Sequence, residues 1–453
     1  MVNLCGIIGI YDKENKDISK ILYYGMYALQ HRGQESAGIA VNKNGFIDYF
    51  KDAGLVHEVF PKETLSRFRG NIGIGHVESK DNGEEEISLS AQPLVVGYKK
   101  GALALANDGN LINSRQLREK LEDDGVIFST NTDTEVIANL IARFHKDDIE
   151  IAIQKSLKMV KGSYSLVLMT LDRLIGVRDP YGIKPLSIGK LGDNYILSSE
   201  TCAFDTIGAT YIRDVEPGEM VVISDGELKS IKSGKEYNKK LCIFELIYMA
   251  RPDSKIDGKT IYLARRKAGQ ILAKEWPADG DIVISAPDSG TVAAIGYAEA
   301  SGIPYDEGLI KNRYVGRTFI KPTQELREQG VKIKLNVLEE NVEGKKVVLV
   351  DDSIVRGTTM RSIVTMLKKA GAKEVHVRIS SPPVIYPCYF GLDTTKRKNL
   401  IASDKSIEEI RKIIGADSLN YLSLQGLIDG AGGEDVFCTG CFDENYPMDI
   451  EDI

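Results

Sequence analysis

The segment at residues 345–371 constrains the fold of this chain more than any other part of the sequence. An apolar run ends directly in Asp351 and Asp352, a loop of small and hydroxyl-bearing residues follows, and a helix is expected at residues 360–370, with Gly371 placed to end it. A buried strand that leads through a tight loop into a helix is the repeating unit of a parallel sheet covered by helices. The same alternation runs from about Lys239 onward, so the sequence predicts a doubly wound parallel sheet there.

The chemistry of this loop favours phosphate binding. Backbone N–H groups and hydroxyls at a helix N-terminus bind phosphate, and two adjacent acids accept hydrogen bonds from vicinal ribose hydroxyls and help to hold Mg²⁺. An ordinary acidic helix cap needs neither the second acid nor the Arg-Gly-Thr-Thr that follows. The nucleotide motifs GxxxxGK[ST] and GxGxxG between a strand and a helix are absent from the sequence. The expected phosphate loop consists of Ser353, Ile354, Val355, Arg356, Gly357, Thr358 and Thr359.

The length of 453 residues predicts two domains. The first half shows short apolar segments joined by turns rich in Gly and Asn, with a few amphipathic helices between them, which predicts sheets buried on both faces. The pattern of predicted strands and helices changes in the polar stretch at residues 230–240. We therefore expect one domain at residues 5–238 and a second at residues 239–453.

Composition excludes several classes of function. A net charge of −7 argues against nucleic-acid binding, which requires a basic face. The sequence contains no apolar run of about 18 residues, the length that would predict a membrane span. The first residues lack the features of a secretory signal. We therefore expect a cytoplasmic protein. In a reducing compartment its six cysteines are expected to be a nucleophile, metal ligands or buried apolar residues, not disulfides.

Three segments of the second half resemble a known family. The acid pair and its loop are similar to the phosphoribosyl-pyrophosphate loop of type I phosphoribosyltransferases. Residues 281–290 resemble the family's pyrophosphate loop, which implies Ser289 as a hydroxyl ligand of Mg²⁺ together with Asp351 and Asp352. Residues 311–320 resemble the basic loop that closes over the substrate in glutamine phosphoribosylpyrophosphate amidotransferases, which implies that Lys311 and Arg313 face the pyrophosphate.

The N-terminal segment resembles the N-terminal-nucleophile amidotransferases, whose domain is a four-layer αββα structure. The resemblance rests on Cys5-Gly-Ile-Ile-Gly, on His-Arg-Gly-Gln-Glu at residues 31–35, and on Gly109 and Asp133. It implies that Cys5 is the catalytic nucleophile and that Arg32, Gly109 and Asp133 line a glutamine pocket. Removal of residues 1–4 would free the α-amino group of Cys5 to act as the general base for its thiol.

Two residues depart from the family pattern in this pocket. Glu78 stands where the family has the Arg that binds the glutamine α-carboxylate, and Asp108 stands where it has an Asn that donates to the oxyanion. Loss of one oxyanion donor costs about 2.7–4 kcal/mol of transition-state stabilisation. Our hypothesis is that glutamine hydrolysis is weakened or absent, and that the transferase then uses free ammonia or another amine.

The remaining cysteines predict a metal centre. The CxxC of Cys438 and Cys441 is by itself consistent with half a zinc site, a redox pair or chance. The iron–sulfur branch of the amidophosphoribosyltransferase family, however, has cysteines at the positions of Cys242, Cys388, Cys438 and Cys441, which implies a [4Fe–4S] cluster. We expect it to tie the C-terminal tail to the transferase domain. Cys202 is expected to pack as a small apolar residue.

The resemblance, which runs over nearly the whole chain, implies formation of 5-phosphoribosylamine and pyrophosphate from phosphoribosyl pyrophosphate in purine synthesis. Its implied partners are phosphoribosyl pyrophosphate, glutamine or ammonia, purine nucleotide inhibitors and further copies of the chain in a homo-oligomer. Two alternatives stay open at this point. The same transferase could serve another pathway, or the chain could be a catalytically silent sensor of phosphoribosyl compounds or nucleotides.

Overall fold

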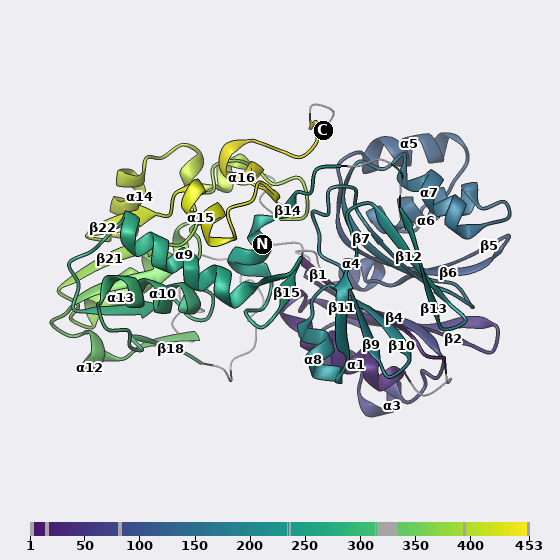
Figure 1. Ribbon diagram of the computed structural model, residues 1–453, viewed down its shortest axis with the longest axis horizontal. Helices are drawn as coiled ribbons and strands as arrows, with labels where there is room; N and C mark the ends of the chain where they lie inside the picture. The colour runs from purple at the N-terminus through teal and green to yellow at the C-terminus, as the bar shows by residue number, and fades with distance from the viewer. Residues whose placement is uncertain are drawn as a thin grey trace.

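The computed structural model describes residues 4–13, 18–79, 84–232, 234, 237–312, 314, 334–392 and 396–450. Two bodies lie side by side, the first formed by the N-terminal half and the second by the C-terminal half (Figure 1). Among the described residues, no helix is long and apolar enough to cross a membrane.

The N-terminal half contains two antiparallel sheets. The seven-stranded sheet has the order β11-β9-β10-β1-β4-β2-β3, and its strands are, in chain order, β1 Leu4–Tyr11, β2 Ser36–Lys43, β3 Phe46–Ala53, β4 Ile72–Ser79, β9 Ser187–Leu191, β10 Asn194–Ser198 and β11 Thr210–Asp214. The six-stranded sheet has the order β13-β12-β8-β7-β6-β5, formed by β5 Leu94–Tyr98, β6 Gly101–Leu111, β7 Gly162–Met169, β8 Leu174–Arg178, β12 Glu219–Ser224 and β13 Glu227–Lys232.

The sequence of strand β1 is apolar at successive positions, and the packing of the strand explains why. Side chains alternate between the two faces of a strand, and both faces of β1 are covered. Ile7 packs into the core between the two sheets, whereas Ile8 packs toward the helices outside the seven-stranded sheet. These helices are α1 (Ser19–Ala28) and α8 (Cys202–Ile207).

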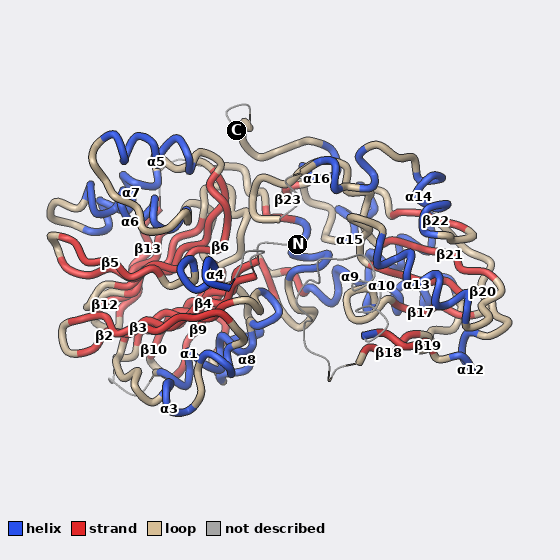
Figure 2. Tube along the Cα trace, turned by 180° about the vertical axis from the view of Figure 1, so that it is seen from behind, coloured by secondary structure: helices blue, strands red, loops and turns tan. Residues whose placement is uncertain are grey.

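The outer face of the six-stranded sheet is covered by other helices (Figure 2). Packing against it are α6 (Asp133–Phe144) and α7 (Ile149–Leu157), and α5 (Ser114–Asp123) packs on α6. The half therefore has four layers in the order helix, sheet, sheet, helix, which confirms the predicted αββα arrangement. Shorter helices are α2 Val56–Val59, α3 Lys62–Leu65 and α4 Glu84–Ser90.

The C-terminal half is built on a parallel sheet with strand order β17-β20-β21-β22. Its strands are β17 Ile282–Ser285, β20 Lys346–Asp351, β21 Glu374–Ile379 and β22 Ser418–Tyr421. Val348 and Val350 pack against α9 (Ile261–Glu275) and α10 (Thr291–Ser301) on one face. Val347 and Leu349 pack toward α13 (Thr358–Lys369) and α14 (Ile407–Ile414) on the other, which confirms the doubly wound sheet.

Short elements complete this half. They are β14 Leu241–Cys242, the π-helix η2 Glu245–Met249, β15 Lys255–Ile256, β16 Lys259–Thr260, β18 Leu309–Lys311, β19 Leu335–Val337, α12 Glu339–Val342, α15 Leu424–Gly430, β23 Phe437–Cys438 and α16 Gly440–Asp443. The helix expected at residues 360–370 begins two residues earlier, at Thr358. The reason is that Gly357 adopts a left-handed conformation (φ 77°), which turns the chain from the loop directly into the helix.

The two halves are joined by direct contacts where the chain passes between them. Lys240 N donates to Tyr181 O at 2.7 Å, and Cys242 N donates to Ile183 O at 3.0 Å. The buried guanidinium of Arg178 forms two hydrogen bonds, of 2.8 and 2.9 Å, with the carboxylate of Asp257. The segment after residue 238 is therefore fixed to the first half over several residues.

Candidate active sites

The acid pair lies at the carboxyl end of β20, where a parallel sheet offers its binding edge. Asp352 N donates to Asp351 Oδ1 at 2.8 Å, and Ser353 Oγ donates to Asp352 Oδ2 at 2.5 Å. Burial and the neighbouring carboxylate of Asp352 raise the pKa of Asp351 well above the usual range. Two adjacent carboxylates with such a shift are a site that a cation would stabilise.

The expected pyrophosphate loop lies directly beside this acid pair. A Cβ added at Gly290 would lie 2.5 Å from Val350 O and 2.9 Å from Asp351 Cα, so only glycine allows the loop that carries Ser289 to approach so closely. Lys311, at the end of β18, extends its ammonium to 2.5 Å from Asp288 Oδ2 in the same loop. Arg313 lies outside the described residues.

The loop at residues 353–359 is held from the far side by the segment that precedes α14. Ile401 N donates to Val355 O at 2.9 Å, and a Cβ on Gly357 would meet the Ile401 side chain at 2.8 Å. The structure thus brings together the acid pair, the phosphate loop, the Ser289 loop and Lys311, all of which we expected to share one site. Their individual roles stay predictions.

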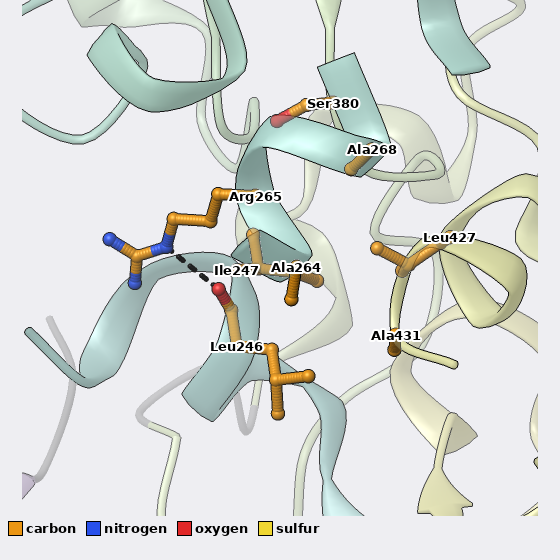
Figure 3. Close-up of a pocket in the computed structure, with 8 residues that line it drawn as sticks. All are labelled: Leu246, Ile247, Ala264, Arg265, Ala268, Ser380, Leu427 and Ala431. Carbon is orange, nitrogen blue, oxygen red and sulfur yellow. Dashed lines mark hydrogen bonds between the residues drawn. The ribbon is translucent and has the colours of Figure 1, made fainter. Parts of the chain in front are cut away.

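An apolar pocket lies behind this edge, between η2, α9 and α15 (Figure 3). Arg265 is one of the residues that line it, and this residue is almost completely buried. It donates from Nε to Leu246 O at 2.7 Å and from Nη2 to Ala250 O at 2.8 Å. Burial lowers the pKa of this guanidinium, and the carboxylate of Asp352 opposes the shift.

The expected nucleophile, Cys5, is a buried residue of β1. Its partner across the sheet is Glu78 of β4, the residue that departs from the family pattern. Burial raises the pKa of the Cys5 thiol well above its usual range, and the charges of Glu78 and Asp108 raise it further. These surroundings disfavour the thiolate, the reactive form of cysteine. Residues 1–3 of the expected leader lie outside the described residues.

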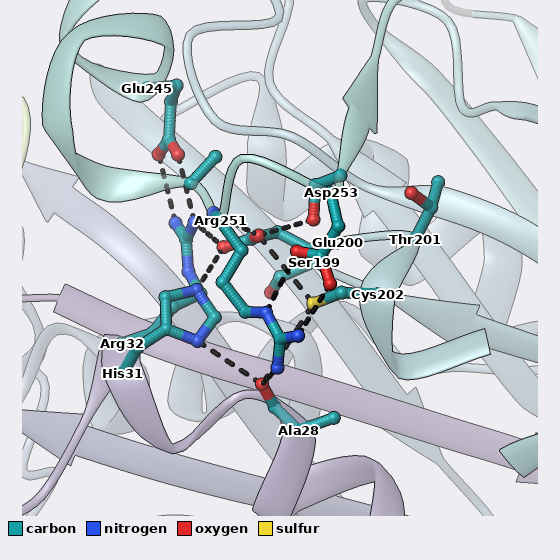
Figure 4. A network of polar contacts seen from close by, with 12 residues as sticks. Ala28, His31, Arg32, Ser199, Glu200, Thr201, Cys202, Glu245, Arg251 and Asp253 are labelled. Atoms are coloured by element: carbon teal, nitrogen blue, oxygen red, sulfur yellow. Dashed lines mark hydrogen bonds and ion pairs between the residues drawn. The ribbon is translucent and has the colours of Figure 1, made fainter. Parts of the chain in front are cut away.

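Arg32 lies beside Cys5 but is fully buried, and all five N–H donors of its guanidinium are engaged. Figure 4 shows its contacts with Glu200 and Glu245. Nε donates to Cys5 O at 2.7 Å. The terminal nitrogens donate to Glu200 at 2.8 Å, to both carboxylate oxygens of Glu245 at 2.9 Å, and to Asp108 at 3.0 Å. Arg32 therefore has no donor available for glutamine in this arrangement, and its expected role in the pocket stays a prediction.

Glu200 extends this charged group toward the second half of the chain. It accepts from His31 Nε2 at 2.7 Å, from Ser254 Oγ at 2.7 Å and from Arg251 N at 2.9 Å. These contacts, mainly with His31, together with Arg32, hold the pKa of the buried Glu200 carboxyl well below its usual range despite burial. We call Arg32, Lys184, Asp108, Glu200 and Glu245 the buried charge cluster.

Gly109 follows Asp108 in β6, and Asp133 bonds to the end of the same strand; their expected place in a glutamine pocket stays a prediction. Gly109 has φ 145°, and a Cβ there would lie 2.2 Å from Ser163 O, so the strand needs glycine at this point. Asp133 begins α6, and its Oδ2 accepts from Leu111 N at 2.7 Å. The buried Cys202 packs in the core outside the seven-stranded sheet, as expected for a small apolar residue.

The four cysteines expected to hold a cluster converge in one apolar core. Strands β14 and β23 pair in parallel with Cys242 opposite Cys438. Cys441 O accepts from Ile385 N and Tyr386 N, both at 3.0 Å, shortly before Cys388. Burial raises the pKa of Cys441 well above the usual thiol range, and the other three cysteines raise it further.

Within the described part of the chain, no three His, Cys, Asp or Glu side chains are arranged to hold a metal ion. All six cysteines are described, and none forms a disulfide. The four thiols lie in one apolar core, and cysteine thiolates are the residues that hold iron–sulfur clusters.

Sequence reasoning missed the roles of Lys184, Glu200 and Glu245. Each lies in a segment that already resembled the family, but a charged residue in a motif does not reveal its partner. Arg32 and Glu245 are 213 positions apart. Their contact can be seen only in the three-dimensional structure.

A four-layer domain with a cysteine in its first strand, followed by a parallel sheet with a phosphoribosyl-type loop, defines the class of the protein. It is a two-domain amidotransferase in which the second domain transfers nitrogen to a phosphoribosyl group. The glutamine amidotransferase domain family matches residues 84–206, and the phosphoribosyl transferase domain family matches residues 258–381.

Full-length relatives make this assignment specific. The amidophosphoribosyltransferase of Archaeoglobus fulgidus is 50% identical over 452 residues, covering 99% of this chain and 98% of that protein. The Bacillus subtilis amidophosphoribosyltransferase is also 50% identical, over 98% of this chain and 94% of that protein. The B. subtilis glutamine phosphoribosylpyrophosphate amidotransferase structure, complexed with ADP and GMP, has a TM-score of 0.92 and 50% identity, covering 98% of both chains.

The chain belongs to the amidophosphoribosyltransferase family. It is a glycosyltransferase of purine synthesis, as the sequence predicted, and the fold class is confirmed as well. These relatives give no support to service in another pathway or to a non-catalytic sensor.

Proposed function

We propose that phosphoribosyl pyrophosphate binds at the carboxyl edge of the transferase sheet and that ammonia, rather than glutamine, is the effective nitrogen donor. The observation that carries the first part is the close approach of the Gly290 loop to Asp351, which puts the acid pair and the pyrophosphate loop in one site. The resulting reaction is the displacement of pyrophosphate from C1 of the ribose by the amine.

The residues of the phosphate loop would bind the 5′-phosphate at the N-terminus of α13, where backbone N–H groups have no partner within the helix. Asp351 and Asp352 would accept hydrogen bonds from the two ribose hydroxyls. Lys311 and the Ser289 loop would lie on the pyrophosphate side. Because negative charge grows on pyrophosphate as the C1 bond breaks, a cation there stabilises the transition state more than the ground state.

Mg²⁺ fits this site because the acid pair carries two adjacent carboxylates with no ion-pair partner among the described residues. Asp351, Asp352 and the Ser289 hydroxyl would hold it. When bound, Mg²⁺ would neutralise charge on the pyrophosphate.

Three features of the glutamine pocket support ammonia as the donor. Glu78 lies opposite Cys5 in the sheet, where its charge opposes both the thiolate and a substrate carboxylate. Asp108 offers a carboxylate in place of an amide donor. Arg32 uses all its donors within the buried charge cluster. The pocket thus has fewer groups that can bind glutamine than the family pattern provides.

We also propose a [4Fe–4S] cluster on Cys242, Cys388, Cys438 and Cys441. The burial of the four thiols in one apolar core supports it, and so do the contacts that hold their segments. Because Cys242 is fixed to the first half through Ile183 O, the cluster would join three parts of the chain: the tail, the transferase domain and the amidotransferase domain.

Four further features belong to this proposal. The domains are taken to meet between residues 238 and 239, which lies between the two family matches. Purine nucleotides are proposed as inhibitors, since the B. subtilis relative was solved with ADP and GMP. A cytoplasmic location and a homo-oligomeric assembly are proposed from the resemblance.

The decisive experiment is to measure consumption of phosphoribosyl pyrophosphate by anaerobically purified protein, with ammonium and with glutamine as separate nitrogen donors. We expect turnover with ammonium and little or none with glutamine. Equal turnover with both donors would show that other residues bind glutamine. Absence of turnover with either donor would contradict the proposed transferase site.

A further inference from the structure

Lys184 is a buried cation without a hydrogen-bond acceptor among the described residues. Its side chain is 1% exposed, and its ammonium lies 3.4 Å from Asp108 Oδ1. Within the described residues, neither this nitrogen nor this oxygen has a hydrogen-bond partner. A buried ammonium that makes no hydrogen bond is costly, so three strong donors in the middle of the protein require an acceptor.

The segments around Lys184 are those that carry two of the four clustered cysteines. The preceding residue, Ile183, accepts from Cys242 N at 3.0 Å. On the other side, a Cβ added at Gly391 would lie 3.0 Å from Lys184 Nζ, so the ammonium lies against the chain three residues beyond Cys388.

The chain next to Cys388 is also fixed to the strands that carry and flank Asp108. Asn110 Nδ2 donates to Tyr389 O at 2.9 Å, and Ser163 Oγ donates to Phe390 O at 2.8 Å. Lys184 thus lies where the amidotransferase domain meets the cysteine group, with Asp108 on one side and the segments of Cys242 and Cys388 on the other.

We propose that Lys184 is a positioning residue for the cluster: its ammonium lies against the segments of Cys242 and Cys388 and balances part of the negative charge of the cluster, and the carboxylate of Asp108 partly offsets that positive charge. This inference rests on the proposed cluster. It gives the unusual carboxylate of Asp108 a structural purpose in place of the lost amide donor. Charge and hydrogen bonds to sulfur are two of the factors that set the reduction potential and stability of iron–sulfur clusters.

Three variants test the proposal in anaerobically purified full-length protein: K184M, K184R and D108N. The readouts are iron and sulfide content, the reduction potential of the cluster from a redox titration followed by electron paramagnetic resonance, and the rate at which visible absorbance is lost in air. Loss of a positive charge makes the cluster harder to reduce. K184M should therefore lower the potential and speed cluster loss by about 10- to 100-fold, the usual effect of removing an outer-shell partner.

The matched variants make the expected shift specific. K184R keeps the charge and should stay close to the wild type. D108N removes a negative charge beside the ammonium, so the potential should shift upward, in the opposite direction to K184M. A purely structural role for Lys184 would not predict shifts of opposite sign.

The outcomes separate this inference from the proposed cluster. Wild-type protein without iron and sulfide, or with zinc, would overturn both. A wild-type cluster with unchanged potential and loss rate in K184M would overturn the role of Lys184 alone. If K184M fails to fold, D108N decides, because an unchanged or lowered potential in that variant contradicts the proposal. Changes in glutamine hydrolysis without any effect on the cluster would instead assign Lys184 to the glutamine pocket.

Discussion

At the carboxyl edge of the transferase sheet, Asp351 and Asp352 lie side by side, and neither forms an ion pair within the described residues. In the amidotransferase domain, by contrast, the guanidinium of Arg32 contacts three carboxylates, and Glu200 is bonded by a further three groups. The pKa shifts follow this difference, since that of Asp351 is raised and that of Glu200 is lowered.

The difference shows how a ligand site can be told from a structural one in this family. Charges that await a ligand repel each other and raise the energy of the folded chain. Charges that hold the fold together are already satisfied by partners. The buried charge cluster occupies the region where a glutamine pocket was expected. Its members Arg32, Glu200 and Glu245 are hydrogen-bonded in the way structural residues are, whereas the Lys184 ammonium makes no hydrogen bond among the described residues.

The largest expected effect is on stability. E200Q replaces a buried carboxylate that accepts from Arg32, His31, Ser254 and the backbone N–H of Arg251, and its amide NH₂ would face these donors, which should lower the free energy of unfolding by about 3–5 kcal/mol. Because the pKa of Glu200 is depressed in the folded state, its contribution is present above its unfolded pKa and is lost as the pH falls through the folded value. Thermal unfolding at pH 7 and at acidic pH measures both effects.

The exposed Glu227 on β13 provides the matched control, E227Q, which should change stability little. A difference between E200Q and the wild type that stays constant down to strongly acidic pH would contradict this assignment.

The next effect is on catalysis. D351N and D352N each remove a carboxylate from the proposed ribose and Mg²⁺ site, and ammonium-dependent turnover should fall by about 10²–10³. The matched control is D279N, because Asp279 pairs with Lys346 at the opposite end of the same strand. If D279N and D351N were equally impaired, the loss would reflect the sheet and not the site.

A smaller effect is expected in the glutamine pocket. E78R removes a negative charge beside Cys5 and supplies a cation for the substrate carboxylate. A charge-assisted hydrogen bond contributes about 1.5–3 kcal/mol, so glutamine-dependent turnover should rise by about tenfold or more. Ammonium-dependent turnover should not change. The control E227R introduces the same charge at an exposed position, and an equal gain there would exclude a local effect.

The smallest effect concerns the stability of the transferase site. D351N relieves repulsion between two carboxylates and should raise the unfolding midpoint by about 2–4 °C, the shift that about 1 kcal/mol produces in a domain of this size. Because the folded pKa of Asp351 is raised, this group favours folding at low pH and loses that contribution as the pH rises through the folded value. The advantage of D351N should therefore grow with pH. A destabilised D351N would show that the acid pair is structural.

The transferase site could be predicted in advance because its information is local. Asp351, the phosphate loop and Gly357 are contiguous, so strand, turn and helix signals all fall in one segment. Helix α13 begins two residues before the start that the sequence predicts, because the left-handed conformation of Gly357 is a turn feature that helix periodicity does not report.

The amidotransferase pocket was harder to predict for the opposite reason. The sequence shows Asp108 and Glu78 as departures from a pattern, but their partners come from distant segments. Arg32 was expected to face glutamine, and nothing near it in the sequence indicates that Glu245, in the other domain, would take two of its donors. Likewise, the sequence does not indicate that the Lys184 ammonium is buried without a hydrogen bond, which is the feature that points to its role.

The parallel pairing of β14 with β23 has a consequence for the order in which the chain folds. It joins the segment at the domain junction to one near the C-terminus, and the nearby contact between Lys240 and Asp435 spans 195 positions. During synthesis the second partner leaves the ribosome only after both domains have been made. Each domain thus has time to fold separately, and the junction closes last, as contacts of long sequence separation form slowly.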